Sequence, residues 1–280
     1  MSDFTKQKFG GLWTEQKLEM VSKYLNFYLI ALKNKRFKKV YIDVFAGTGS
    51  ILSKDEEKLM AGSAKRALKI EEKFDRYYFV EYDKDKVLEL RNMVHSEFPD
   101  LEDRVDIRQG DANVKLFEIL SEIDWTDTRG VLFIDPFATQ FEWASLVEVS
   151  RTKSLDIWYL FPISALNRML KTDGRMDPTW EKRVDRLLGD HEWKAAFYKT
   201  SPQQSLFGNE EIEKDGSVDN MREYITSKLR RVFPGVAPNP YVFRGPTNSP
   251  LFLFCFAVSN DNPVAIKLAL KVAEHILNHT

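Results

Sequence analysis

The sequence predicts an α/β fold built on a mostly parallel β-sheet. Between residues 40 and 162, short apolar segments alternate with amphipathic helical segments, which is typical of parallel βαβ units. The apolar segments are nearly continuous, which indicates strands that are covered on both faces. Several of them end in an acidic residue or a glycine turn, where open α/β sheets bind their ligands.

The elements follow one another in a regular order. Residues 14–35 place their apolar side chains on one helical stripe, with Thr14 as the expected N-cap and Trp13 packed on Leu18. The expected strands are "VYIDVFAG", "RYYFVEYD", "RVDIRQGDA", "GVLFIDPF" and "LDIWYLFP". The helices between them are "GSAKRALKIEEKF" (with Ser63 as N-cap), "KDKVLELRNMVHSEF", "NVKLFEILSEI" and "FEWASLVEVSRT".

After Pro162 the alternation stops. Residues 163–235 show helical patterns with no convincing strand, except "FYKT", and predict a helical insertion that could cover the site as a lid. The segments "PYVFRG" and "LFLFCFAVSN", separated by the turn-rich "PTNSP", predict an antiparallel pair before a last helix at about 263–277. We therefore expect a single α/β domain over residues 1–280, with residues 1–36 as an N-terminal helical extension.

Composition excludes little beyond the membrane and secreted classes. The chain has 41 basic and 42 acidic residues, so its overall charge gives no case for nucleic-acid binding. A single cysteine, Cys255, excludes an internal disulfide, and the start of the chain lacks an apolar signal core. We expect a cytoplasmic globular protein without a metal site, because the four histidines are scattered.

The strand ends carry the residues that suggest a nucleoside site. In "DVFAGTG", Gly47 and Gly49 would let a ligand approach the backbone closely. In "FVEYD", Glu81 and Asp83 are the usual type of residue for binding a ribose diol, and in "QGDA", Asp111 could accept a hydrogen bond from an exocyclic amine. Alternatively, the glycines only form a tight turn, and Asp83 and Asp111 only cap helices.

The glycine turn is not of a phosphate-binding type. It lacks the lysine and hydroxyl of "GxxxxGK[ST]" and departs from "GxGxxG", and the next helix starts too late to face a pyrophosphate. These departures argue against ATP and NAD.

The order of these strand-end segments resembles that of the class I S-adenosylmethionine-dependent methyltransferases, which have a Rossmann-like, seven-stranded sheet with an antiparallel last strand. More specifically, "YIDVFAGTGS", "GSAKRAL", "FVEYDKD", "IDPFA", "QQSLFG" and "LFCFAVSN" resemble the three-Cys-motif partner family (TcmP). The family name implies a partner protein that carries a three-cysteine motif.

The resemblance implies roles for particular residues. It places the methionine end of S-adenosylmethionine against Asp43, whose carboxylate suits an α-amino group, and it places the ribose at Glu81 and the adenine amine at Asp111. The full set of expected cofactor-binding residues is Asp43, Phe45, Ala46, Gly47, Gly49, Glu81, Tyr82, Asp111 and Ala112.

The segment Asp135, Pro136 and Phe137 is the expected catalytic site. It resembles the "DPPY" motif of amino-methylating nucleic-acid enzymes, in which the acid accepts hydrogen bonds from a target amine and an aromatic ring stacks on the base. Here Phe137 replaces the second proline and Ala138 stands at the aromatic position, so Phe137 or Phe141 would supply the ring. As an alternative, Asp135 is only an acid at a helix start.

The acceptor is less well defined than the cofactor. Arg168 is the expected contact for an anionic group of a substrate or partner, or else a surface ion pair, and the basic run 33–39 is a phosphate contact or a solvated helix end. Three functions remain open: a methyltransferase on an amino group of a nucleic acid or nucleotide, a methyltransferase on a protein or small molecule, and a binding module without catalysis.

Overall fold

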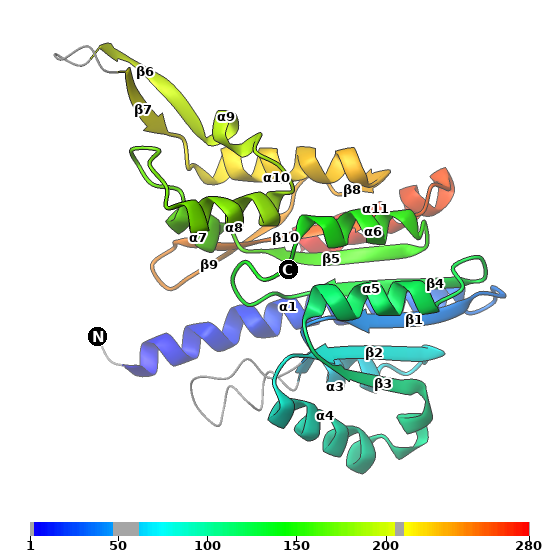
Figure 1. Cartoon of the computed structure of the whole chain (residues 1–280). Coiled ribbons are helices and arrows are strands. Elements are labelled where there is room, and N and C mark those ends of the chain that lie inside the picture. Colours follow the sequence, from blue (N-terminus) through cyan, green and yellow to red (C-terminus); the bar gives the residue numbers. More distant parts are fainter. Residues whose placement is uncertain (1–2, 47–61, 205–209, 280) are drawn as a thin grey trace.

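The computed structural model describes residues 3–46, 62–204 and 210–279 and shows a central mixed sheet between two layers of helices (Figure 1). The sheet order is β3-β2-β1-β4-β5-β10-β8, with β9 also paired to β10. The parallel strands β1 to β5 span Lys38–Asp43, Arg76–Glu81, Val105–Gln109, Thr128–Ile134 and Leu155–Phe161. β10 (Pro250–Val258) is antiparallel to β5, as predicted, and also pairs with β9 (Tyr241–Arg244) and the unpredicted two-residue strand β8 (Gly235–Val236).

Each face of the sheet has its own hydrophobic core. On one face Tyr41, Phe79 and Trp158 pack against α1 and α11 and neighbouring helices. On the other face Ile42, Leu132 and Tyr159 pack against α5, α6 and the helices after β5. The first group of helices is α1 (Asp3–Leu32), α3 (Gly62–Lys69), α4 (Lys84–Glu97) and α11 (Pro263–Asn278), with the 3-10 helix η1 (Pro99–Arg104) after α4. The second begins with α5 (Ala112–Glu122) and α6 (Trp143–Arg151).

Helix α1 is longer than the sequence predicted. It starts at Asp3, so Thr14 lies inside the helix rather than at its N-cap. The expectation was wrong because the backbone N–H groups near Thr14 follow a preceding helical turn and are not the free donors of a helix start. Trp13 packs near Phe243 and Phe252 of the sheet. Ser63 likewise lies inside α3 rather than before it.

The predicted apolar stripe of α1 packs on the sheet, with Leu18, Val21, Leu25 and Leu29 all buried. No helix in the described ranges has both the length and the apolar composition needed to cross a bilayer.

Residues 163–235 leave the sheet at the carboxyl end of β5 (Figure 1). They form α7 (Ile163–Met169), α8 (Pro178–Leu188), α9 (Trp193–Phe197), β6 (Tyr198–Gln204), β7 (Glu210–Lys214) and α10 (Val218–Val232). The β6–β7 hairpin corrects the expectation of an almost strand-free segment. "YKTSPQQ" and "EEIEK" lack the apolar alternation that reveals a strand, because this pair lies outside the main sheet.

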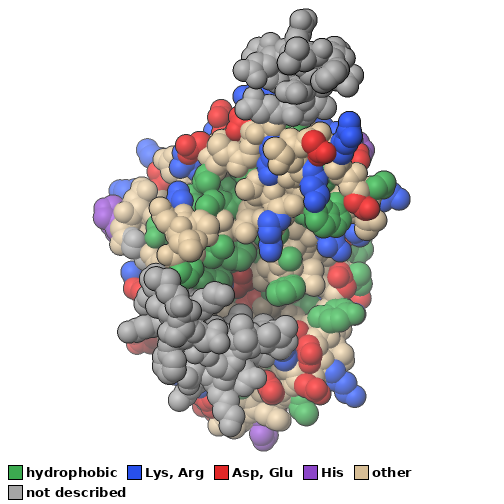
Figure 2. Space-filling view, turned by 90° about the vertical axis from the view of Figure 1, so that its left-hand side faces the viewer, with side chains coloured by type: hydrophobic (Ala, Val, Ile, Leu, Met, Phe, Trp, Pro, Cys, Tyr) green, Lys and Arg blue, Asp and Glu red, His purple; other side chains and the backbone are tan. Residues whose placement is uncertain are grey.

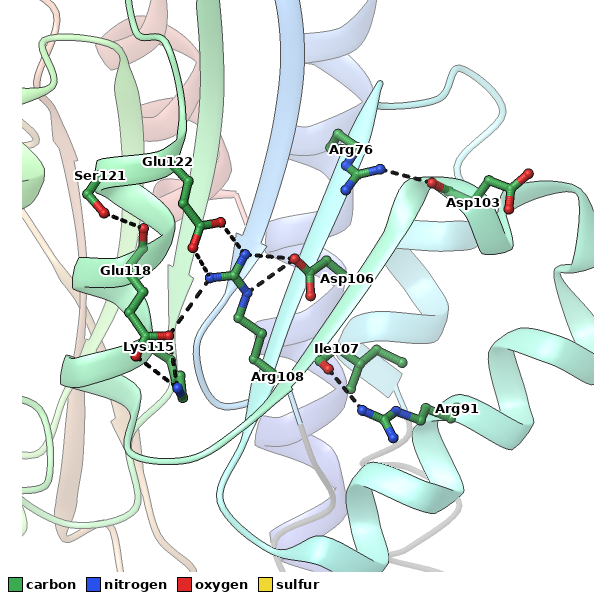
Figure 3. A network of polar contacts seen from close by, with 10 residues as sticks. All are labelled: Arg76, Arg91, Asp103, Asp106, Ile107, Arg108, Lys115, Glu118, Ser121 and Glu122. Atoms are coloured by element: carbon green, nitrogen blue, oxygen red, sulfur yellow. Dashed lines mark hydrogen bonds and ion pairs between the residues drawn. The ribbon is translucent and has the colours of Figure 1, made fainter.

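The edge strand β3 is joined to α5 by charged groups (Figure 3). The Arg108 guanidinium donates to the carboxylates of Glu122 on α5 and Asp106 on β3, at 2.8 Å for the Asp106 contact. The hydrogen bond with Glu122 and the neighbouring Asp106 raise the pKa of Arg108. This network joins the last turns of α5 to strand β3.

Candidate functional site

The carboxyl ends of the parallel strands meet on one face of the molecule. β1 pairs with β4 so that Asp43 lies opposite Phe133, which places Asp135 two residues further along the neighbouring strand. β2 lies on the other side of β1, with Phe79 opposite Asp43, so Glu81 reaches the same edge. Figure 2 looks onto this face and shows acidic and apolar side chains near its centre. The expected Gly47 and Gly49 lie outside the described residues.

Asp43 is the most unusual acid at this edge. It is fully buried, its Oδ1 accepts a hydrogen bond from the Phe45 backbone N–H at 3.2 Å, and its Oδ2 has no partner within the described part of the chain. Burial raises the pKa of Asp43 to about 7, and the negative charge of Asp135 also raises it. A side-chain hydrogen bond with Ser63, the hydrogen bond from the Phe45 backbone N–H and the positive charge of Lys17 lower this pKa. Because this Oδ2 acceptor lies at a strand end, where open α/β sheets bind their ligands, it is a candidate contact for a ligand that donates hydrogen bonds.

Lys17 is a site residue that the sequence reasoning missed. Its side chain reaches from α1 to Asp135 and forms an ion pair with Asp135 Oδ2, although only 1% of Lys17 is exposed. Its ammonium also lies 4.9 Å from the centre of the Trp13 ring. The available signal was its position: Lys17 lies among Trp13, Val21 and Tyr24 on the apolar stripe of the helix, where a charge needs a partner.

The segment after β4 presents an aromatic ring to solvent. The Asp135 side chain is 21% exposed, Pro136 is buried, and Phe137 is 72% exposed. Ala138 adopts a left-handed backbone with φ of 54°, which is uncommon outside glycine. Asp135 does not start a helix, because α6 begins eight residues later with Glu142 at its N-cap. The structure therefore contradicts the alternative role of Asp135 as a helix-start acid.

The second strand end presents one partly buried acid and one exposed ring. Glu81 Oε1 accepts the Asp83 backbone N–H at 2.7 Å, and Tyr82 is 78% exposed. Asp83 caps α4 by accepting from the Asp85 and Lys86 backbone N–H groups. The helix-capping alternative for Asp83 is therefore confirmed, while Glu81 and Tyr82 keep their expected position at the edge.

At the third strand end, one side chain caps a helix and another holds the loop that follows β4. Asp111 Oδ1 accepts the backbone N–H groups of Asn113 and Val114 and so caps α5, and Ala112 is buried behind it. Asn113, which the sequence reasoning missed, accepts from the Glu142 N–H and donates to the Gln140 carbonyl. These bonds join the start of α5 to the loop that follows Phe137. Capping does not exclude a ligand role for Asp111, since its side chain is exposed and only Oδ1 is used by the cap.

The two remaining aromatic candidates face the core. Phe141 is only 1% exposed, and its ring packs against Phe45 and Tyr159 at centroid distances of 6.2 and 5.6 Å. Phe141 is thus not placed to stack on a substrate, because the chain turns inward to begin α6. Phe45 is partly buried in the same core.

Arg168 lies on α7, which follows directly from the carboxyl end of β5. The side chain is exposed and forms no ion pair with any described residue, so the alternative of a surface ion pair is not seen. α7 therefore starts at the same carboxyl edge of the sheet as Asp43 and Asp135, and its buried residues pack in the core on the α5 and α6 face.

Comparisons with known proteins find no family for the chain and only distant similarity to solved structures. No protein-family model matches the chain, and no curated protein sequence matches it significantly. Among solved structures, protein LPL1258 of Legionella pneumophila (DUF519) is 15% identical, with 92% of each chain covered and a TM-score of 0.44. A putative O-methyltransferase from Klebsiella pneumoniae is 13% identical over 88% of this chain and 89% of that one, with a TM-score of 0.39. The cofactor-bound structure of Rv0187 from MTB is 14% identical over 90% of this chain and 89% of that one, also with a TM-score of 0.39.

These scores are low, so the fold assignment rests on the sheet itself. The strand order and the antiparallel β10 are those of a Rossmann-like, class I methyltransferase-like fold. The site lies where ligands bind in such sheets, at the carboxyl ends of the strands around the point where the order reverses.

Proposed function

We propose that the chain is an S-adenosylmethionine-dependent methyltransferase that acts on an amino group of a nucleic acid or nucleotide. The observation that carries this proposal is the buried Asp43 Oδ2 at the end of β1, an acceptor with no donor among the described residues. An α-ammonium group would supply both the missing hydrogen bond and the opposite charge. The residues present therefore fit the amino-acid end of this cofactor.

Three strand ends would hold the cofactor. Asp43 binds the α-amino group, Glu81 binds the ribose hydroxyls, and the second carboxylate oxygen of Asp111 accepts from the adenine amine. The exposed Tyr82 offers an apolar surface beside Glu81. When bound, S-adenosylmethionine supplies an electrophilic methyl group attached to sulfur.

Asp135 and Phe137 would act on the acceptor. The Asp135 carboxylate accepts hydrogen bonds from the target amine and so keeps electron density on the nitrogen as it attacks. Phe137 is the exposed ring next to this acid, and base–aromatic stacking favours a flat nitrogenous ring at this place. This position of Phe137 supports a base rather than an aliphatic amine as the acceptor.

Calorimetry with S-adenosylhomocysteine tests the cofactor assignment. Asp43→Asn should weaken binding at least tenfold, because a charge-assisted hydrogen bond contributes roughly 1.5–3 kcal/mol. Asp156→Asn is the matched control: Asp156 on β5 is also a carboxyl with a pKa raised to about 7 by burial, but it already accepts from Tyr24. Equal effects of the two substitutions, or no binding by the unmodified protein, would refute the assignment.

Methyl transfer identifies the acceptor class. Labelled S-adenosylmethionine is incubated with single-stranded RNA, single-stranded DNA, free nucleotides and protein fractions, and the product is analysed by mass spectrometry. Transfer to an exocyclic amine, lost in Asp135→Ala, is the expected result. Transfer to protein alone would replace the nucleic-acid proposal by the second function, and cofactor binding without any transfer would favour a binding module.

We also propose that the chain works with a three-Cys-motif partner protein, a proposal that rests on the sequence resemblance. The outer surface of residues 163–235 is the expected contact region, because α7 starts at the edge of the site. Co-purification with a co-expressed three-cysteine protein tests it, and an Arg168→Glu variant would show whether α7 contributes.

A further inference from the structure

Two acids and one lysine lie together at the ends of β1 and β4, so one of the acids has no cationic partner among the described residues. Asp43 and Asp135 are acids, and among the described residues Lys17 is the cation that acts on Asp43 and pairs with Asp135. Lys17 is committed to Asp135 through its ion pair, while Asp43 Oδ2 has no partner in the described chain. The acid expected to receive a target amine is thus already occupied by an amine of the protein itself.

An amino-acid ligand would change this arrangement. Its α-ammonium matches the unpaired Asp43 Oδ2, and its carboxylate would then be close enough to interact with Lys17, a buried cation that acts on Asp43. Two carboxylates, Asp135 and that of the ligand, would compete for one buried ammonium. At low local dielectric such competition is strong, because each unpaired buried charge is costly.

We propose that Lys17 changes its partner when the cofactor binds. It pairs with Asp135 in the free protein and with the carboxylate of the cofactor's amino-acid end in the complex, and we call this exchange the latch. This inference rests on the proposed function and assigns a cofactor-binding residue on α1. Transfer of Lys17 to the cofactor frees Asp135 to accept the target amine. Cofactor binding therefore precedes productive acceptor binding.

A second buried lysine–aspartate pair, Lys228–Asp190, resembles the Lys17–Asp135 pair but has no unpaired acid like Asp43 among its described neighbours. Lys228 is 4% exposed, pairs with Asp190 and lies 5.1 Å from the Trp143 ring, much as Lys17 lies beside Asp135 and Trp13. The nearby Glu192 is paired with Arg231. The Lys228–Asp190 pair therefore has a structural role within the insertion and is a control for any effect of breaking a buried lysine–aspartate pair.

The test compares two ligands by calorimetry: S-adenosylhomocysteine, which has the amino-acid end, and 5′-methylthioadenosine, which lacks it. Asp135→Asn should tighten S-adenosylhomocysteine binding roughly tenfold, about 1.4 kcal/mol, because Lys17 is released, and should leave 5′-methylthioadenosine binding unchanged. Lys17→Met should weaken S-adenosylhomocysteine binding, and the gain from Asp135→Asn should vanish in the double variant. Asp190→Asn should change neither affinity.

Unchanged or weaker S-adenosylhomocysteine binding in Asp135→Asn would overturn the latch while leaving the proposed function intact, provided that the unmodified protein binds. An equal gain for both ligands would also overturn it, because the effect would not act through the amino-acid end. Failure of the unmodified protein to bind S-adenosylhomocysteine would overturn the proposed function together with the latch.

A crystal structure of the unmodified protein with S-adenosylhomocysteine gives an answer that does not depend on how the variants fold. The latch requires Lys17 Nζ to lie within hydrogen-bond distance of the ligand carboxylate and away from Asp135. Lys17 still paired with Asp135 in that complex would overturn it.

Discussion

At the scale of single residues, the main feature of the candidate site is a buried acid next to a second acid. Asp43 is a carboxyl group buried beside a second acid, and one of its oxygens has no donor among the described residues. Such an arrangement lowers stability, and groups of this kind are concentrated at functional sites. Asp156 shows the contrast: burial also raises its pKa to about 7, but the Tyr24 hydroxyl satisfies it.

The pH dependence of stability should report the state of Asp43. Because its pKa is raised to about 7 from 3.8, the folded protein retains a proton between these values that the unfolded chain has lost. The contribution is therefore complete below about pH 4 and is lost as the pH rises through 7. Relative to Asp43→Asn, the free energy of unfolding of the unmodified protein should fall by roughly 3–4 kcal/mol from pH 4 to pH 8. Urea titrations at four pH values would measure this, and a difference independent of pH would contradict it.

At the scale of elements, the same helices that pack on the sheet also carry residues of the candidate site. Asp111 caps α5 and lies at the end of β3, so a single side chain fixes the helix and faces the ligand edge. Helix α1 has a comparable double role, since it fills one face of the sheet and carries Lys17 to Asp135.

The two roles of Asp111 can be separated by substitution. Asp111→Ala should lower the free energy of unfolding by about 1 kcal/mol, because two N–H groups lose their acceptor, whereas Asp111→Asn should preserve the cap. Both variants should weaken S-adenosylhomocysteine binding if the carboxylate contacts adenine. Asp177→Ala, which removes the cap of α8, should cost similar stability without changing ligand affinity. Thermal unfolding and calorimetry on the same samples check both effects, and normal binding by Asp111→Ala would remove it from the cofactor site.

The attachment of α1 to the sheet depends on the Tyr24–Asp156 hydrogen bond of 2.6 Å. This bond lowers the pKa of Asp156, against a larger increase from burial. Tyr24→Phe should therefore destabilise the protein more at pH 9, where Asp156 is ionised and would lose a bond worth roughly 1.5–3 kcal/mol, than at pH 5.5. Tyr28→Phe, one turn further along the same buried face, is the control. Chemical denaturation at the two pH values decides, and an equal loss at both would contradict the prediction.

At the scale of the whole molecule, the insertion starts at the same edge of the sheet as the candidate site. Residues 163–235 begin at the carboxyl end of β5, and their apolar side chains join the same core as the sheet; these include Leu166, Leu170, Val184, Leu187, Leu188, Ile225 and Leu229. The described surface beside the site thus combines the exposed Phe137 with the unpaired Arg168.

Charge reversal at Arg168 tests whether this surface binds an anionic acceptor. Arg168→Glu should weaken binding of a single-stranded oligonucleotide severalfold and reduce the slope of log affinity against log salt by about 1, because one phosphate contact is lost. S-adenosylhomocysteine affinity should not change. Arg151→Glu, at the far end of α6, is the control. Fluorescence anisotropy at several salt concentrations measures the effect, and identical binding curves for the two variants would exclude Arg168 as a contact.

Local patterns were sufficient to predict most of the sheet and its acidic edge. The runs "VYID", "GVLFI" and "IWYLF" are buried strands because continuous apolar segments fit only a sheet covered on both faces, and the βαβ alternation makes them parallel. The positions of Asp43, Glu81, Asp111 and Asp135 at one edge follow from the same rule, because parallel strands end on the same side. The β6–β7 hairpin was not predicted, because its sequences lack the alternation of apolar and polar residues that marks a strand.

The sequence by itself therefore determined which residues end the strands, but not which of them are paired or exposed. Only the tertiary structure brings Lys17 to Asp135, because the contact joins residues that are 118 positions apart and depends on how α1 packs across the sheet. It also turns Phe141 into the core and Phe137 outward, although the two are close in sequence. Burial and pairing of charges are properties of the packed chain, so the electrostatics of the site arise only at that level.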